Sequence, residues 1–204
     1  MNREQLEHVI RAASSVLGED GVIIIGSQAI LGTVPNGLPR AVTLSIEVDV
    51  MAIEDITGDK ALLINGTIGE LTRFHTTFGY YAEGVEDGVS RLPHGWRERL
   101  VKVETPATNN TTGWCLELHD LCVSKFIANR DRDLSYVRAL LRSGHAKPDV
   151  LLERAATTEM SAAELARIVE FIASNGRPGR KNKARHAVRR DVQGLTAGGD
   201  AAGE

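Results

Sequence analysis

The sequence predicts an α+β fold, in which a mixed α/β sheet is flanked by helices and followed by a helical C-terminal part. Three observations indicate this class. The apolar run 22–25 lies between two glycines, as expected of a buried strand. Residues 42–51 alternate between apolar and polar side chains, which is the period of a strand with one polar face. Apolar residues recur at helical spacing near the N-terminus and again beyond residue 119.

The first quarter of the chain predicts a helix, a strand, a short helix and a second strand. Residues 3–17 carry apolar side chains at helical spacing, and Gly18 follows as a stop. After the strand 22–25, Ser27 is a candidate N-cap for a short helix over 27–32. A Pro- and Gly-rich loop then leads to the strand 42–51.

The rest of the chain predicts shorter strands and then four helices, of which the last opens with a capping box formed by Ser161 and Glu164. The expected elements are a helix over 60–72, strands within 78–85 and 100–104, a turn at 109–113, a short strand at 114–118, and helices over 119–130, 133–143, 148–155 and 161–174.

Composition divides the chain into three parts. We expect a domain over residues 1–145 and a helical extension packed on it over 146–176. Residues 177–204 form a basic and then Gly/Ala-rich tail, which has too few apolar residues to fold and which we expect to be disordered. The tail is predicted to be solvated, with contact to RNA or DNA as the alternative.

The composition narrows the class of protein. The 204 residues carry a net charge of −3, which gives no general attraction to nucleic acid. No apolar run approaches the length of a membrane span, and the N-terminus does not resemble a signal peptide, so we expect a cytoplasmic protein without membrane contact. Cys115 and Cys122 form neither a disulfide framework nor a zinc pattern and are expected to be reduced thiols. The oligomeric state is left open.

Two neighbouring segments carry residues suited to phosphate chemistry. Glu47 and Asp49 alternate along the predicted strand 42–51, so their carboxylates point to one face and lie about 7 Å apart. Such a pair can hold hard divalent cations. Gly26 and Ser27 follow a buried strand, where a helix start would offer N–H groups and a hydroxyl to a phosphate. The plainer interpretations are an exposed polar strand face and an ordinary turn between a strand and a helix.

Together with a third segment, these residues resemble a known superfamily. The Gly26–Ser27 turn followed by Glu47-Val48-Asp49-Val50 is similar to the signature of polymerase-β-like nucleotidyltransferases. The segment 118–134, with Asp120-Leu121, Lys125, Arg130 and Asp133-Leu134, resembles the helix pair of small bacterial nucleotidyltransferase-like proteins, including the AbiEii-type toxins.

The resemblance implies a role for each matching residue. Gly26 and Ser27 would contact the β and γ phosphates of an NTP, and Glu47 and Asp49 would hold Mg²⁺. Lys125 would neutralise phosphate charge, and Asp133 would orient Lys125 or complete the acidic site. Arg130, five residues after Lys125 and close to its helix face, is a further phosphate ligand. The alternatives are an exposed Lys125 and a helix-capping Asp133.

The chain also departs from the superfamily pattern. Between Ser27 and Glu47 lie 19 residues, a long spacing that the Pro- and Gly-rich loop would absorb, and the first acid is Glu where Asp is commoner. The best sequence candidate for a third metal-binding acid is Glu104.

We therefore predict a magnesium-dependent nucleotidyltransferase that moves an NMP from an NTP to a hydroxyl on RNA, protein or a small molecule. The toxin-like resemblance implies an RNA acceptor such as tRNA, and a cognate antitoxin as partner. The alternative is a catalytically inactive nucleotidyltransferase-like module that binds a nucleotide or a protein partner. The acceptor and the choice of NTP are not specified by the sequence.

Overall fold

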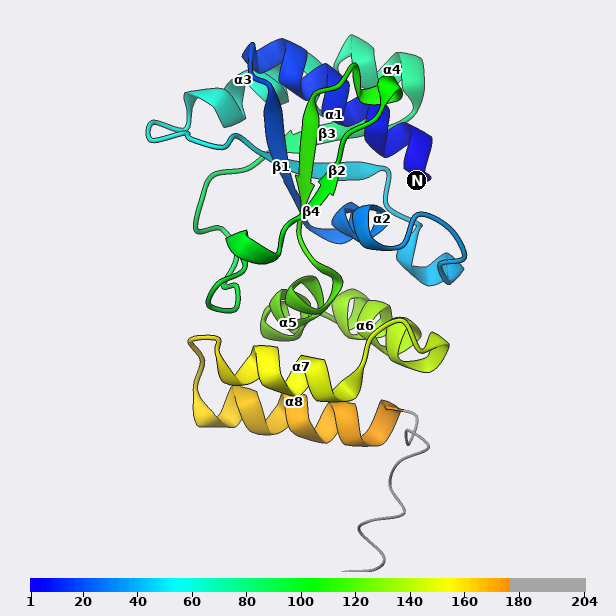
Figure 1. Cartoon of the computed structure of the whole chain (residues 1–204), viewed down its shortest axis with the longest axis vertical. Coiled ribbons are helices and arrows are strands. Elements are labelled where there is room, and N and C mark those ends of the chain that lie inside the picture. Colours follow the sequence, from blue (N-terminus) through cyan, green and yellow to red (C-terminus); the bar gives the residue numbers. More distant parts are fainter. Residues whose placement is uncertain (177–204) are drawn as a thin grey trace, which may run out of the picture.

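The computed structural model describes residues 1–176, so the predicted tail lies outside the described residues. It has a five-stranded mixed sheet flanked by helices and a helical C-terminal part, which confirms the predicted class (Figure 1). The helices are α1 (Arg3–Leu17), α2 (Ile30–Thr33), α3 (Asp59–Ile68), α4 (Arg73–Phe78), α5 (Leu118–Ala128), α6 (Asp131–Ser143), α7 (Pro148–Ala156) and α8 (Ala162–Asn175). The strands are β1 (Gly21–Ile25), β2 (Glu47–Met51), β3 (Tyr81–Gly84), β4 (Val101–Val103) and β5 (Thr112–Cys115).

The sheet has the strand order β3-β2-β1-β5-β4. β1 lies at the centre and is buried along its whole length, as its run of apolar residues predicts. It pairs antiparallel with β2 and parallel with β5, while β3 runs parallel to β2 at one edge. On β2 the residues Val48 and Val50 are fully buried, so the alternate residues Glu47 and Asp49 face the opposite side of the sheet.

The second predicted strand is too long. β2 covers only residues 47–51, and a 3-10 helix (Arg40–Val42) occupies the start of the predicted range. Leu44 and Ile46 belong to the apolar half of the alternation, yet their side chains are 65% and 47% exposed. The alternation there does not correspond to a buried face, because these residues lie outside the sheet.

Two further predictions need correction. The expected helix 60–72 ends at Ile68, and the separate helix α4 covers residues 73–77, for which no element was predicted, and Phe78, where a strand was expected to begin. Thr72 caps α4 by accepting a hydrogen bond from the backbone N–H of His75, so a short helix restarts after the break at Gly69. The capping box of Ser161 and Glu164 at the start of α8 is confirmed.

The four C-terminal helices pack on one another below the sheet as it is drawn in Figure 1. α7 lies against α5 and α8, and α8 also contacts α6. The expected boundary at residue 145 falls between α6 and α7, and the division into a domain over 1–145 and an extension over 146–176 stays a prediction. Within residues 1–176 no helix is both long and apolar enough to cross a bilayer.

The start of α5 is fixed by an ion network. Asp120 is fully buried, and its carboxylate receives two hydrogen bonds from Arg99, at 2.8 and 3.1 Å. Arg154 of α7 lies 3.3 Å from the same carboxylate. Two guanidinium groups thus compensate one buried charge, and they connect α5 to the segment before β4 and to α7.

Both cysteines are free and fully buried. Burial raises the pKa of the Cys115 thiol to about 12 and also raises that of Cys122. These thiols therefore stay protonated and pack as small apolar side chains.

Candidate functional site

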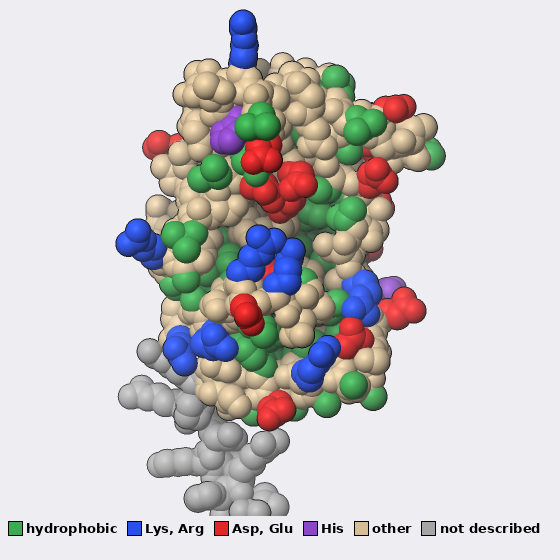
Figure 2. Space-filling model, turned by 180° about the vertical axis from the view of Figure 1, so that it is seen from behind, with side chains coloured by type: hydrophobic (Ala, Val, Ile, Leu, Met, Phe, Trp, Pro, Cys, Tyr) green, Lys and Arg blue, Asp and Glu red, His purple; other side chains and the backbone are tan. Residues whose placement is uncertain are grey.

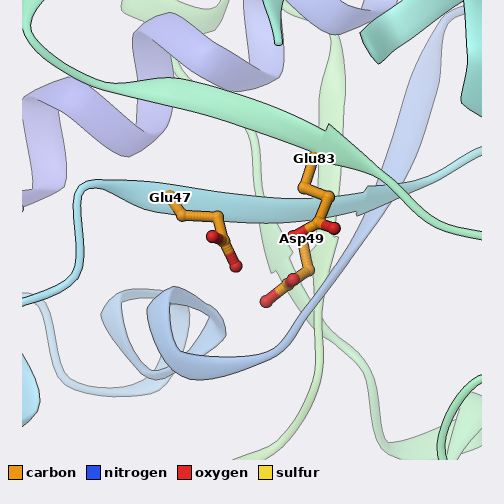
Figure 3. Close-up of side chains that lie close together, drawn as sticks. All are labelled: Glu47, Asp49 and Glu83. Carbon is orange, nitrogen blue, oxygen red and sulfur yellow. The ribbon is translucent and has the colours of Figure 1, made fainter. Parts of the chain in front are cut away.

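An acidic cluster lies on one face of β2 and β3. The side chains of Glu47 and Asp49 point the same way from β2 (Figure 3). Glu83 of β3, which is the register partner of Asp49, lies beside them. Each of the three residues offers a carboxylate oxygen within 4.8 Å of the others. Three hard oxygen ligands at this separation can surround a divalent cation such as Mg²⁺.

The third acid of the cluster is therefore Glu83, and the sequence-based candidate Glu104 is wrong. Glu104 follows β4, at the opposite edge of the sheet, where it pairs with Lys102 at 2.9 Å and accepts a hydrogen bond from Thr112. The sequence places Glu83 within a predicted strand but gives no sign that this strand pairs with β2. Choosing Glu83 would have required the order of the strands in the sheet, which the sequence does not give.

Like charges make this cluster unfavourable without a cation. Burial and the neighbouring carboxylates of Glu47 and Glu83 raise the pKa of Asp49 from 3.8 to about 7. The pKa of Glu83 is raised by burial and by its hydrogen bond and charge contact with Glu47. On its outer side Glu47 accepts a 2.9 Å hydrogen bond from the hydroxyl of Tyr81, which fixes the direction of its carboxylate.

Gly26 allows the backbone after β1 to pass close to the acids. Its φ of +65° is in the region that favours glycine, and a Cβ at this position would lie 1.5 Å from an oxygen of Asp49. No other residue fits here without displacing the carboxylate. The 3-10 helix η1 (Ser27–Ala29) begins directly afterwards.

Ser27 does not cap that helix, contrary to the sequence-based prediction. The N-cap is Gly26, and no side chain caps the helix. The Ser27 hydroxyl instead accepts a 2.9 Å hydrogen bond from the ammonium group of Lys125, which lies 98 residues later in the chain. This contact leaves the hydroxyl beside the positive charge, on the surface that faces the acids.

Lys125 is buried, so the interpretation as an exposed helix residue is wrong. Its side chain is 9% exposed, and its ammonium group donates 2.9 Å hydrogen bonds to Ser27 and to Asp133 of α6. The ring of Tyr136 lies beneath the ammonium, 4.5 Å from the nitrogen to the ring centre. Three contacts, one from the turn after β1 and two from α6, thus hold the charge in one position.

The acids and the cations line one cavity of about 670 Å³. Glu47, Asp49 and Glu83 form one wall, and Lys125, Arg130 and Arg132 contribute to the other. Figure 2 shows a group of acidic side chains facing a group of Lys and Arg side chains across a hollow. The volume is within the range of small-molecule sites, and the divided charge suits a metal-bound polyphosphate.

A comparison with protein families finds a match over most of the chain. Residues 4–173, which include every element from α1 to most of α8, match the family described as nucleotidyltransferase of unknown function (DUF6036). The chain belongs to this family. No curated protein and no solved structure matches it. Membership of DUF6036 agrees with the nucleotidyltransferase-like resemblance, and the AbiEii-type branch stays a prediction.

In this DUF6036 protein Arg130 and Asp133 lie apart from the acidic cluster. Asp133 contacts Lys125 and Arg130, at 2.9 and 2.5 Å, so it orients the cations and does not complete the acidic site. Burial opposes the charge of Asp133, but hydrogen bonds from Arg130 and Lys125 lower its pKa. Arg130 is not on the helix of Lys125, since α5 ends at Ala128 and Arg130 is the N-cap residue of α6.

Tyr136 and Arg132 are site residues that the sequence did not reveal. The Tyr136 hydroxyl donates a 2.7 Å hydrogen bond to the backbone oxygen of Ser27, so this residue contacts both the turn and Lys125. Arg132 is exposed and lines the cavity beside Arg130. Helical spacing marks Tyr136 only as a core residue, and no local pattern connects it to Ser27.

Proposed function

We propose that the protein transfers an NMP from an NTP to a hydroxyl acceptor in a magnesium-dependent reaction. The observation that carries this proposal is the placement of three carboxylates opposite Ser27 and Lys125 in one cavity. Acids alone would suit many metals, and cations alone would suit many anions. Their arrangement on facing walls matches the needs of a metal-bound triphosphate.

Glu47, Asp49 and Glu83 would hold the Mg²⁺. Their donor set fits this ion, because all the ligands are carboxylate oxygens and because a bound cation would offset the burial and the charge repulsion that raise the pKa of Asp49. When bound, Mg²⁺ would stabilise negative charge on the reacting phosphate and on the leaving pyrophosphate.

The remaining residues would bind and orient the substrate. The hydroxyl of Ser27, the ammonium of Lys125 and the exposed guanidinium of Arg130 would hold the β and γ phosphates. An acceptor hydroxyl oxygen then forms a bond to the α phosphorus, and the bond from that phosphorus to the β-phosphate bridging oxygen breaks. Pyrophosphate leaves, and the hydroxyl proton passes to the carboxylate of Glu83, the exposed member of the cluster.

For the acceptor we propose an RNA hydroxyl, such as the end of a tRNA, and for the partner a cognate antitoxin. The support is the similarity of the segment around Lys125 and Asp133 to toxin-like nucleotidyltransferases. A catalytically inactive module is the competing proposal, and it differs in one measurable way: it would bind Mg²⁺ and NTP without turnover.

Turnover of each α-labelled NTP with total RNA and Mg²⁺ tests the proposal. We expect label to enter RNA, together with release of pyrophosphate and a matching mass increase on the modified species. Asp49→Asn should abolish incorporation, while Glu104→Gln is the matched control because it removes an acid outside the cluster. Binding of Mg²⁺ and NTP without incorporation into any acceptor would favour the inactive module.

A further inference from the structure

A second cavity of about 230 Å³ adjoins the proposed active site. The two cavities share Ile25, Val89 and Ser90 as lining residues, so they lie next to each other. The second cavity has apolar walls and an acidic rim. Its apolar lining residues are Ile25, Met51, Val89, Leu92 and Trp96.

The floor of this cavity continues the strand face that carries the acids. Met51 follows Asp49 by two residues on β2, so both side chains point to the same face, about 7 Å apart. Ile25 of β1 is paired in register with Asp49. A ligand that is bound to a metal at Asp49 therefore has the apolar cavity directly beside it along the sheet.

The shape and chemistry of this cavity suit a nucleobase. A base has apolar faces that pack against aromatic and aliphatic side chains, and a polar edge that must find hydrogen-bond partners. Trp96, whose ring also contacts the guanidinium of Arg97, and Val89 can contact the faces, and the Val89 side chain is 58% exposed and so accessible to a ligand.

The rim of the cavity offers hydrogen-bond acceptors. Asp87 is paired with Arg97 at 2.7 Å, whereas the carboxylate of Glu86 has no ionic partner among residues 1–176. A carboxylate accepts hydrogen bonds and donates none, so it favours a base edge that carries an amino group. Adenine, guanine and cytosine have such a group, and uracil does not.

We propose that this cavity holds the base of the NTP and that Glu86 favours bases with an amino group. The proposal rests on the proposed function, which places the triphosphate of the same molecule at Ser27. Ile25, Gly26 and Ser27 are consecutive in the chain, so the cavity floor and the phosphate ligand lie on either side of Asp49. A nucleotide has this order of parts, with the ribose and the α phosphate between the base and the terminal phosphates.

Equilibrium binding without any acceptor tests the proposal on the full chain. In the presence of Mg²⁺ we expect ATP, GTP or CTP to bind at least about tenfold tighter than inorganic tripolyphosphate, since stacking on an aromatic side chain contributes this much. UTP should bind more weakly than the other three, and Glu86→Gln should reduce that difference.

Substitutions in the cavity walls should affect the base and not the phosphates. Trp96→Leu and Val89→Ser should each weaken NTP binding, with the larger loss, about tenfold, for Trp96→Leu, and should leave tripolyphosphate binding unchanged. Val89 is exposed, so its variant keeps the test valid if Trp96→Leu fails to fold. The matched controls are Trp114→Leu on β5 and Val169→Ser on α8, which line neither cavity.

Three outcomes would overturn the proposal. Equal binding of NTP and tripolyphosphate by the wild type would exclude a base subsite while leaving the proposed function intact. Unchanged NTP affinity in the wall variants, together with a raised KM for an RNA acceptor, would assign the cavity to the acceptor. Failure of the wild type to bind either NTP or tripolyphosphate with Mg²⁺ would overturn the proposed function, and the base subsite with it.

Discussion

The two walls of the main cavity are built on opposite electrostatic principles. The wall on β2 and β3 gathers three like charges within 4.8 Å, and this repulsion together with burial raises the pKa of Asp49 to about 7. On the facing wall, Lys125 and Arg130 share the carboxylate of Asp133, and each charge has an opposite neighbour. Among residues 1–176 no Lys or Arg forms an ion pair with Glu47, Asp49 or Glu83, whereas the cationic wall contains the carboxylate of Asp133.

This difference indicates how each wall would act. Paired and hydrogen-bonded groups keep one geometry in the absence of ligand, so the cationic wall is pre-organised for a phosphate. The repulsion within the acidic wall is relieved when a cation binds or when Asp49 is protonated. We therefore expect substitutions in the acidic wall to change activity without loss of stability, and substitutions in the cationic wall to change both.

The largest effect should come from Asp49→Asn. We expect turnover to fall at least about 10³-fold, because the variant loses a central metal ligand. Stability without metal should rise, by about 1–3 kcal/mol at pH 8, because a repelled buried charge is removed. Turnover assays and urea denaturation in EDTA measure the two quantities. Retained activity would remove Asp49 from the metal site, and a clear loss of stability would contradict the repulsion inferred for this wall.

Lys125→Met should lower both turnover and the stability of the fold. It leaves the buried carboxylate of Asp133 with Arg130 alone, so we expect a loss of about 2–4 kcal/mol in the free energy of unfolding and a fall in turnover of about 10²-fold. Lys125→Arg should not restore activity, because a planar guanidinium does not fit contacts made by a compact ammonium.

Two further variants sharpen the Lys125 prediction. The double variant Lys125→Met/Asp133→Asn should regain part of the stability but none of the activity. Lys102→Met removes an exposed lysine from a pair with Glu104 and should cost less than about 1 kcal/mol. A stability loss no larger for Lys125→Met than for Lys102→Met would show that the buried pair contributes little.

The acidic wall also predicts a dependence on pH. Because the pKa of Asp49 is raised from 3.8 to about 7 in the folded protein, its protonated form favours folding. This contribution is complete below about pH 4 and is lost as the pH rises through 7. The stability difference between Asp49→Asn and wild type should therefore be small near pH 4, grow up to about pH 7 and level off above it, as measured by urea denaturation in EDTA. Saturating Mg²⁺ should reduce the difference, and a difference that is constant with pH would contradict the raised pKa.

The smallest effect should come from Tyr136→Phe. The variant keeps the ring beneath Lys125 but loses the hydrogen bond to the backbone of Ser27, so the phosphate-binding turn is less firmly held. We expect a three- to tenfold rise in the KM for NTP, a smaller change in kcat and a stability loss of about 1 kcal/mol. Tyr80→Phe, which removes a hydroxyl bonded to His8 away from the cavity, is the control. Equal kinetic effects in the two variants would leave Tyr136 with a purely structural role.

Patterns within one segment predicted the helices and strands better than they predicted which strands pair in the sheet. The helix over 3–17 and the strand 22–25 were correct, because spacing and burial are visible within one segment. The strand 42–51 was too long, since alternation shows which residues could form a strand and not which have a neighbour to pair with. The choice of Glu104 over Glu83 failed for the same reason, as it depended on the order of strands in the sheet.

Residue patterns alone did not predict the contacts that form the cationic wall. The contact between Ser27 and Lys125 spans 98 residues, and only a resemblance to other proteins brought these two residues together before the structure did. Nothing in the sequence near Tyr136 points to Ser27, because the contact depends on how α6 packs beside the turn.

The buried Asp120 gives the cavity a mechanical dependence on distant parts of the molecule. It lies five residues before Lys125 on α5, about 7.5 Å along the helix axis, so a rigid displacement of α5 at Asp120 would also move the backbone of Lys125. Arg99 and Arg154 set the position of Asp120, and neither lines the cavity. Alignment errors near 1 Å can slow a reaction strongly. Substitutions of Arg99 or Arg154 would therefore alter the reaction rate although no residue that lines the cavity has been replaced.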